Sequence, residues 1–190
     1  QILDRLHPLA LKSRILLHRQ CPKRLWLKVH RPELEEIDDG SQSRFATGVH
    51  VGEIARRLFP EGVLVDGDDL GQAIGDTQAI LAGEKRPVFE ATFQSDGVLV
   101  RADLLLPAKR GYRMVEVKQS ASVKDYHLTD AAIQSWVARQ AKLPLASMEI
   151  AHIDSSFVYP GGGDYRGLFR YADISEPVAA MEAEIPGWVS

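Results

Sequence analysis

Two short apolar runs near the middle of the chain alternate with polar residues and are separated by a turn. Residues 98–106 read Val-Leu-Val-Arg-Ala-Asp-Leu-Leu-Leu, and residues 112–119 read Tyr-Arg-Met-Val-Glu-Val-Lys-Gln. Runs of this length that are rich in Val and Leu and bounded by turn residues are typical of β-strands, so the pattern predicts a hairpin with its turn at 107–111. Side chains alternate between the faces of a strand, so we expect Glu116 and Lys118 on one side, with Asp103 nearby on the neighbouring strand.

The remaining apolar positions predict a chain in which helices and strands are mixed. Helical spacing recurs over 9–30 with a break near Cys21-Pro22, and again over 45–59, 69–82, 125–142 and 176–185. Short apolar or alternating runs predict strands at 63–66, 87–93, 148–153 and 168–171, with 157–159 as an extension of the third. The polar stretch 31–43, which contains Pro and Gly, is expected to be a loop.

Composition narrows the class of protein. A chain of 190 residues with 45% hydrophobic and 26% charged residues is long enough for one globular domain with a sizeable core. No apolar run approaches the roughly 20 residues of a membrane span, so we expect a cytoplasmic protein without a membrane partner. The lone Cys21 excludes an internal disulfide and cannot hold a metal centre by itself.

The acidic residues of the predicted hairpin suggest metal chemistry. Two neighbouring carboxylates repel each other unless a divalent cation lies between them, and hard oxygen ligands suit Mg²⁺ or Mn²⁺. A cation beside a lysine is suited to attack on a phosphodiester. The alternative is that Asp103, Glu116 and Lys118 are ordinary charges on a solvated hairpin. The apolar residues on both sides of Asp103 favour the metal site, because a buried carboxylate is costly unless it is paired.

Other polar residues leave two interpretations open. Basic residues crowd the segment 12–31, either as solvated helix faces or as an edge that contacts nucleic-acid phosphates, with Trp26 available for stacking. The net charge of −3 means that such an edge has to be local. Gln134 and His127 lie on a stripe at the edge of the buried face of the 125–142 helix, where they either satisfy local groups or contact a nucleotide.

The order of these elements resembles a known superfamily. A helix, three antiparallel strands, a helix and a strand carry Asp103 on the second strand, Glu116-x-Lys118 on the third and Gln134 on the next helix. This arrangement resembles the RecB-like branch of the PD-(D/E)XK nucleases, which includes CRISPR-associated exonucleases. The segments 20–27, 45–53, 116–134 and 158–167 are also similar to that branch or to an uncharacterised bacterial family within it, so the resemblance covers essentially the whole chain.

The resemblance implies an α/β fold with a restriction-endonuclease-like core, in which a mixed central sheet contains a three-stranded antiparallel meander flanked by helices. It implies one domain over 1–190, with an N-terminal helical segment at 1–44, a catalytic core at 45–174 and a C-terminal helix at 175–190. The implied activity is a deoxyribonuclease that depends on Mg²⁺ or Mn²⁺, is exonuclease-like, acts in DNA repair or defence, and takes single-stranded DNA among its substrates. Asp103, Glu116 and Lys118 would be catalytic, with Asp103 and Glu116 as metal ligands.

Three departures from the family pattern change the implied site. Ala138 replaces a tyrosine four residues after Gln134, and Gly52 falls where many relatives have a histidine, which leaves Glu53, or alternatively His50, as the further metal ligand. Cys21 resembles the first ligand of an iron–sulfur cluster whose other cysteines lie beyond this C-terminus in relatives, so the cluster is expected only in a longer chain. The competing hypothesis is a non-catalytic module that binds nucleic acid or another partner on the same fold.

Overall fold

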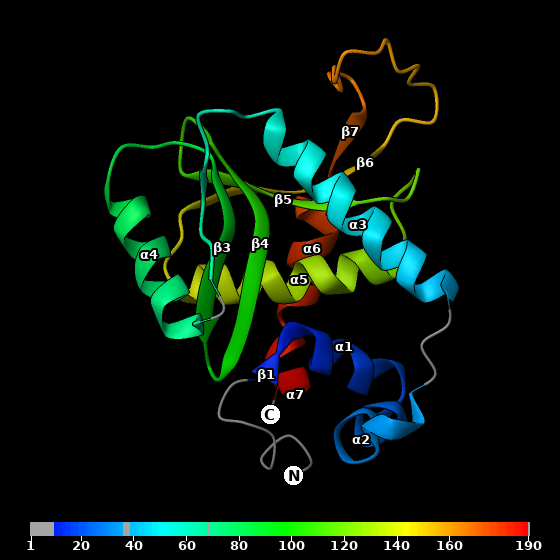
Figure 1. The fold of residues 1–190 in the computed structure, drawn as a ribbon. Helices are drawn as coiled ribbons and strands as arrows, with labels where there is room; N and C mark the ends of the chain where they lie inside the picture. Colours follow the sequence, from blue (N-terminus) through cyan, green and yellow to red (C-terminus); the bar gives the residue numbers. More distant parts are fainter. Residues whose placement is uncertain (1–9, 36–38, 68, 190) are drawn as a thin grey trace.

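The computed structural model describes residues 10–35, 39–67 and 69–189, and it shows a mixed β-sheet with helices on both faces (Figure 1). The strands follow the order β2 (Val63–Leu64), β3 (Val88–Ser95), β4 (Val98–Pro107), β5 (Tyr112–Lys118), β6 (Leu145–Ile153) and β7 (Phe169–Asp173), and β1 (Ala10–Leu11) pairs with β4. Strands β3, β4 and β5 pair antiparallel in chain order, whereas β5 and β6 pair parallel through the α5 crossover. The prediction of an α/β fold is confirmed.

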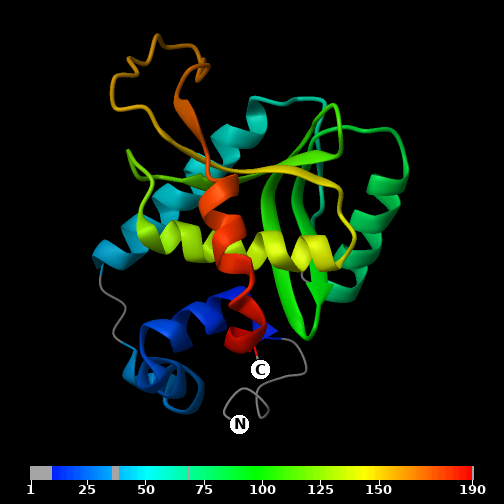
Figure 2. The ribbon, with the colours of Figure 1, turned by 180° about the vertical axis from the view of Figure 1, so that it is seen from behind.

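The helices divide between the two faces of the sheet. They are α1 (Lys12–Gln20), α2 (Pro22–His30), α3 (Asp39–Arg57), α4 (Leu70–Ala82), α5 (Asp125–Gln140), α6 (Ser175–Glu182) and α7 (Ile185–Val189), with a 3-10 turn, η2, at Pro32–Leu34. Helix α3 crosses the face seen in Figure 1, and α5 and α6 cross the opposite face seen in Figure 2. Two apolar clusters correspond to these layers, one beneath α3 and one that joins α5 to the sheet.

Most of the predicted elements are present, and the differences have local causes. The break between α1 and α2 falls at Cys21, as predicted. The loop prediction for 31–43 is wrong from Asp39 onward, because α3 begins there, and residues 36–38 lie outside the described residues. A polar first turn is common at a helix start, so its composition resembles that of a loop. The expected strand extension at 157–159 is not formed, and Val158 is 84% exposed.

The turn between β4 and β5 depends on one glycine. Gly111 has a φ of +79°, and a Cβ atom placed on it would lie 1.7 Å from the carbonyl oxygen of Pro144. The next residue, Tyr112, donates its backbone N–H to that same oxygen at 2.8 Å. Glycine is therefore required here for both backbone conformation and space, and the contact fixes the start of β5 against the start of β6.

Within the described ranges, no helix is long and apolar enough to cross a membrane.

Candidate active site

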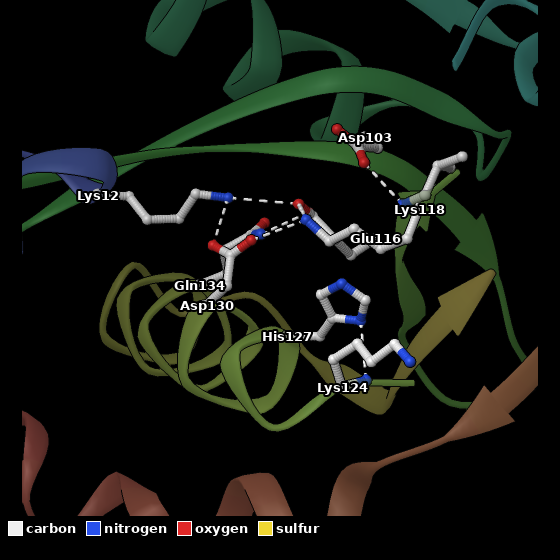
Figure 3. A network of polar contacts seen from close by, with 9 residues as sticks. Lys12, Asp103, Glu116, Lys118, Lys124, His127, Asp130 and Gln134 are labelled. Atoms are coloured by element: carbon white, nitrogen blue, oxygen red, sulfur yellow. Dashed lines mark hydrogen bonds and ion pairs between the residues drawn. The ribbon is translucent and has the colours of Figure 1, made fainter. Parts of the chain in front are cut away.

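Asp103 lies where the pairing of β4 and β5 stops. The register between these strands ends at Leu104 opposite Val115, and the Asp103 side chain follows immediately on β4. Its Oδ2 accepts the backbone N–H of Val117 at 2.7 Å (Figure 3). The carboxylate thus replaces a rung of the β-ladder, and this bond holds it beside the stretch of β5 that carries Glu116 and Lys118.

Glu116 is the centre of the polar contacts. Its side chain is 5% exposed, and Oε1 lies 2.7 Å from the Lys118 ammonium. The other oxygen, Oε2, accepts a hydrogen bond of 2.5 Å from Nε2 of Gln134 on α5. Glu116 and Lys118 therefore lie on the same side of β5, as the alternation of the sequence predicts.

Two further residues close a ring of charges around Lys118. Its ammonium lies 2.9 Å from Oδ2 of Asp130, and Lys12 Nζ lies 2.7 Å from Oδ1 of Asp130 and 3.5 Å from Oε1 of Glu116. We call Lys12, Glu116, Lys118 and Asp130 the charge ring (Figure 3). Sequence reasoning assigned Lys12 only to a general basic segment and gave Asp130 no role. The spacing of Asp130 and Gln134, one helical turn apart, is the signal that identifies Asp130.

The electrostatics of the two hairpin acids differ. Burial, reinforced by the nearby Glu116, raises the pKa of Asp103 to about 8. Burial acts in the same direction on Glu116, but Lys12 and Lys118 outweigh it and hold the pKa of that carboxyl far below its usual range. Burial opposes the charge of Lys118, and Glu116 and Asp130 reverse the effect, so the pKa of Lys118 is raised. Glu116 and Lys118 are therefore both ionised at neutral pH, and Asp103 is the acid on which burial outweighs the two lysines.

A hollow of about 720 Å³ opens between α3 and the sheet next to these acids. Among its lining residues are Val49 and Arg56 of α3, Glu90 of β3, Asp103 and Glu116. Arg56 Nη1 lies 3.1 Å from Oε1 of Glu90. Glu90 has a φ of +56°, a conformation that costs energy for a residue with a side chain and that concentrates at functional sites. Sequence analysis missed Glu90, because a single acid in a strand pattern resembles a solvated position.

The other predicted site residues, one metal ligand and two substrate contacts, lie elsewhere or already have partners. Glu53 is half exposed and lies 3.8 Å from Nδ1 of His50, and it lines a different hollow, near Phe59, so the structure does not bring either residue to Asp103 and Glu116. Gln134 has no exposed side-chain surface and orients Glu116 instead of facing a substrate. His127 is 2% exposed, and its Nδ1 accepts the N–H of Lys124 at the start of α5.

The donor set suits one class of metal ion. In the described part of the chain, no group of three or more His, Cys, Asp and Glu side chains is arranged to hold an ion. Mg²⁺, however, is commonly held by one or two carboxylates, with waters and substrate oxygens completing its octahedral shell. Asp103 and Glu116 supply those carboxylates beside an open hollow, and a cation there would oppose the burial and the repulsion from Glu116 that raise the pKa of Asp103.

The free thiol of Cys21 is exposed on the N-terminal segment. It precedes α2 and makes no side-chain capping bond to that helix. Its assignment to an iron–sulfur cluster in a longer chain stays a prediction.

Comparison with known proteins gives no family. No protein-family model matches the chain, and no curated protein matches it. Among solved structures, the crystal structure of SSO0001 aligns over 99% of this chain and 79% of its own, with a TM-score of 0.47 and 15% sequence identity. A likeness of this degree carries no conclusion about function.

Proposed function

We propose that the protein is a Mg²⁺- or Mn²⁺-dependent deoxyribonuclease. The observation that carries the proposal is the placement of Asp103 and Glu116 together at the end of the β4–β5 ladder, with the Lys118 ammonium 2.7 Å from Glu116. A buried Glu and a half-buried Asp beside an ammonium and an open hollow are an expensive arrangement for a purely structural role. Hydrolysis of a phosphodiester uses each of these groups.

Each residue has a distinct part in that chemistry. Asp103 and Glu116 would hold the divalent ion, which when bound supplies Lewis acidity and lowers the pKa of a coordinated water. Gln134 keeps the Glu116 carboxylate in one orientation through its hydrogen bond to Oε2. Lys118 is a compact positive charge next to Glu116, where it can orient the attacking water and offset the negative charge that grows on the phosphate in the transition state.

The N-terminal segment supports nucleic acid as the substrate. Lys23, Arg24 and Lys28 are exposed on α2, and Trp26 is 43% exposed beside the His30 ring, at 5.0 Å between centroids. Cations interleaved with an exposed aromatic ring are typical of single-strand binding, where phosphates meet the charges and bases stack on the ring. These features support DNA with single-stranded character as the substrate. The proposal also includes an exonuclease-like mode in repair or defence and a cytoplasmic location.

A cleavage assay tests the proposal. Labelled single- and double-stranded oligonucleotides are incubated with Mn²⁺ and wild type, Glu116→Ala or Lys118→Ala. Wild type should cut, and Lys118→Ala should retain DNA binding but lose about two to three orders of magnitude in rate, because its role is concentrated in the transition state. Lys109→Ala is the matched control, since Lys109 is exposed in the turn between β4 and β5.

Two results would contradict the proposal in different ways. A wild-type protein that binds DNA and cuts neither substrate is the non-catalytic module. A Lys118→Ala protein that cuts at the wild-type rate leaves the nuclease intact but removes the role of the lysine.

A further inference from the structure

We infer that Lys12, at the start of the first helix, is a positioning residue of the site and holds Lys118 in place through Asp130 and Glu116. The inference rests on the proposed function, because it gives Lys12 a part in the same reaction. It adds a residue from a segment that lies outside the hairpin and the α5 helix. It also makes the N-terminal helix a component of the active site.

The contacts of Lys12 carry the inference. Its Nζ is 2.7 Å from Oδ1 of Asp130 and 3.5 Å from Oε1 of Glu116, and the ammonium of Lys118 meets the other oxygen of Asp130 and the same oxygen of Glu116. The side chains of Lys12, Lys118 and Asp130 are 20%, 22% and 10% exposed, so solvent screens these contacts only in part. Glu116 and Asp130 raise the pKa of Lys12 although burial acts against its charge.

The ring explains how a flexible lysine keeps one position. The ammonium of a lysine stands at the end of four flexible methylene groups, so the side chain alone does not fix its position. Lys118 lies between two carboxylates, and its single positive charge cannot neutralise both. Lys12 supplies the second positive charge, so the two acids and two lysines balance and Asp130 stays against Lys118.

Helix α1 is anchored independently of the ring, so Lys12 has a defined origin. Ile15 has no exposed surface, and the guanidinium of Arg19 lies 3.7 Å from the centre of the Trp188 ring on α7. Strand β1, which leads directly into Lys12, pairs with β4. These contacts hold α1 against the body of the fold, and they present Lys12 to α5 from a fixed position.

The experiment measures single-turnover cleavage at saturating Mn²⁺ and the dissociation constant for DNA, using the whole chain. The variants are Lys12→Met, Lys12→Arg, Asp130→Asn and the double variant Lys12→Met with Asp130→Asn, with Lys109→Met as the control for loss of one positive charge. Lys12→Met should slow cleavage by about tenfold to a hundredfold, the usual effect of removing a group that orients a catalytic residue. The DNA dissociation constant should stay within about twofold, and Lys12→Arg should restore part of the rate.

The double variant separates positioning from independent effects. Because Lys12 acts through Asp130, the double variant should be no slower than the slower single variant, whereas two independent contributions would multiply. Thermal melting of each variant identifies misfolding, and if Lys12→Met does not fold, Lys12→Arg and Asp130→Asn carry the test.

The outcomes distinguish this inference from the proposed function. If wild type does not cut DNA, the proposed function fails and the positioning role fails with it. If wild type cuts and Lys12→Met cuts equally fast, or if it loses affinity for DNA with an unchanged rate, the positioning role alone is overturned.

Discussion

Replacing Asp103 with Asn should make the metal-free protein more stable and should do so increasingly as the pH rises. The carboxyl of Asp103 is half-buried beside Glu116, and its loss of solvent raises its pKa from 3.8 to about 8. Because its pKa is higher in the folded state, the Asp103 carboxyl holds its proton more tightly in the folded protein than in the unfolded chain. Its contribution to stability is therefore complete below pH 3.8 and is lost as the pH rises towards 8. Asn lacks this ionisation and keeps an oxygen that can accept the N–H of Val117.

The pKa shift sets an upper limit on the effect. Four pKa units at about 1.4 kcal/mol each correspond to about 6 kcal/mol at a pH above 8. The pKa of Glu116 moves in the opposite direction within the same coupled pair, so part of that cost is offset by the lysines of the charge ring. We expect Asp103→Asn to gain about 1–3 kcal/mol at pH 9 and close to nothing at pH 4.

Urea unfolding at pH 4, 7 and 9 in the presence of a chelator measures this difference. Asp76→Asn is the matched control, because Asp76 is an exposed acid on α4. The reasoning is refuted if Asp103→Asn is less stable than wild type at pH 9, since the carboxylate would then be a stabilising group without any cation.

Three further predictions test other parts of the molecule. Millimolar Mn²⁺ should raise the melting temperature of wild type but not that of Asp103→Ala, because an ion that binds only the folded state stabilises it, and a wild type without a shift would remove the metal site. In salt titrations of single-stranded DNA binding, Lys23→Gln and Arg24→Gln should each reduce the steepness of log binding constant against log salt concentration by about 0.7. An unchanged slope would mean that both residues are solvated charges that do not contact phosphates. Gly111→Ala should destabilise the fold by about 2 kcal/mol or more in urea unfolding, because of its left-handed backbone and its closeness to Pro144, and a neutral result would exclude that contact.

The central hairpin could be predicted from the sequence because its signals are local. Alternation places Glu116 and Lys118 on one side of a strand, and the turn that ends at Gly111 brings Asp103 next to them. Gln134 lies on the crossover helix α5 that follows β5, so its distance from Glu116 depends only on a βαβ unit. These residues lie within one short stretch of chain, where period and turn chemistry determine which side chains meet.

The rest of the site depends on tertiary packing that no local pattern encodes. Lys12 meets Glu116 across a separation of 104 residues, and nothing in a basic helix distinguishes it from the lysines that face solvent. Glu90 lines the hollow and has a positive φ, which propensity does not predict for a glutamate. The resemblance implies Glu53 as a metal ligand from its position on the helix, but Glu53 lines a different hollow from the one that Asp103 and Glu116 line.

The pairing of β1 with β4 also has a consequence for the order in which the protein is assembled. During synthesis, the strand to which β1 pairs and the helix that Lys12 contacts are translated only after α2, α3, α4 and β3 have followed β1 and Lys12. Bringing such distant segments together is entropically unfavourable, so contacts of this kind form late. The hairpin that carries Asp103 and Glu116 can therefore form before Lys12 packs against Asp130. We expect the docking of helix α1, which completes the charge ring, to be one of the last steps of folding.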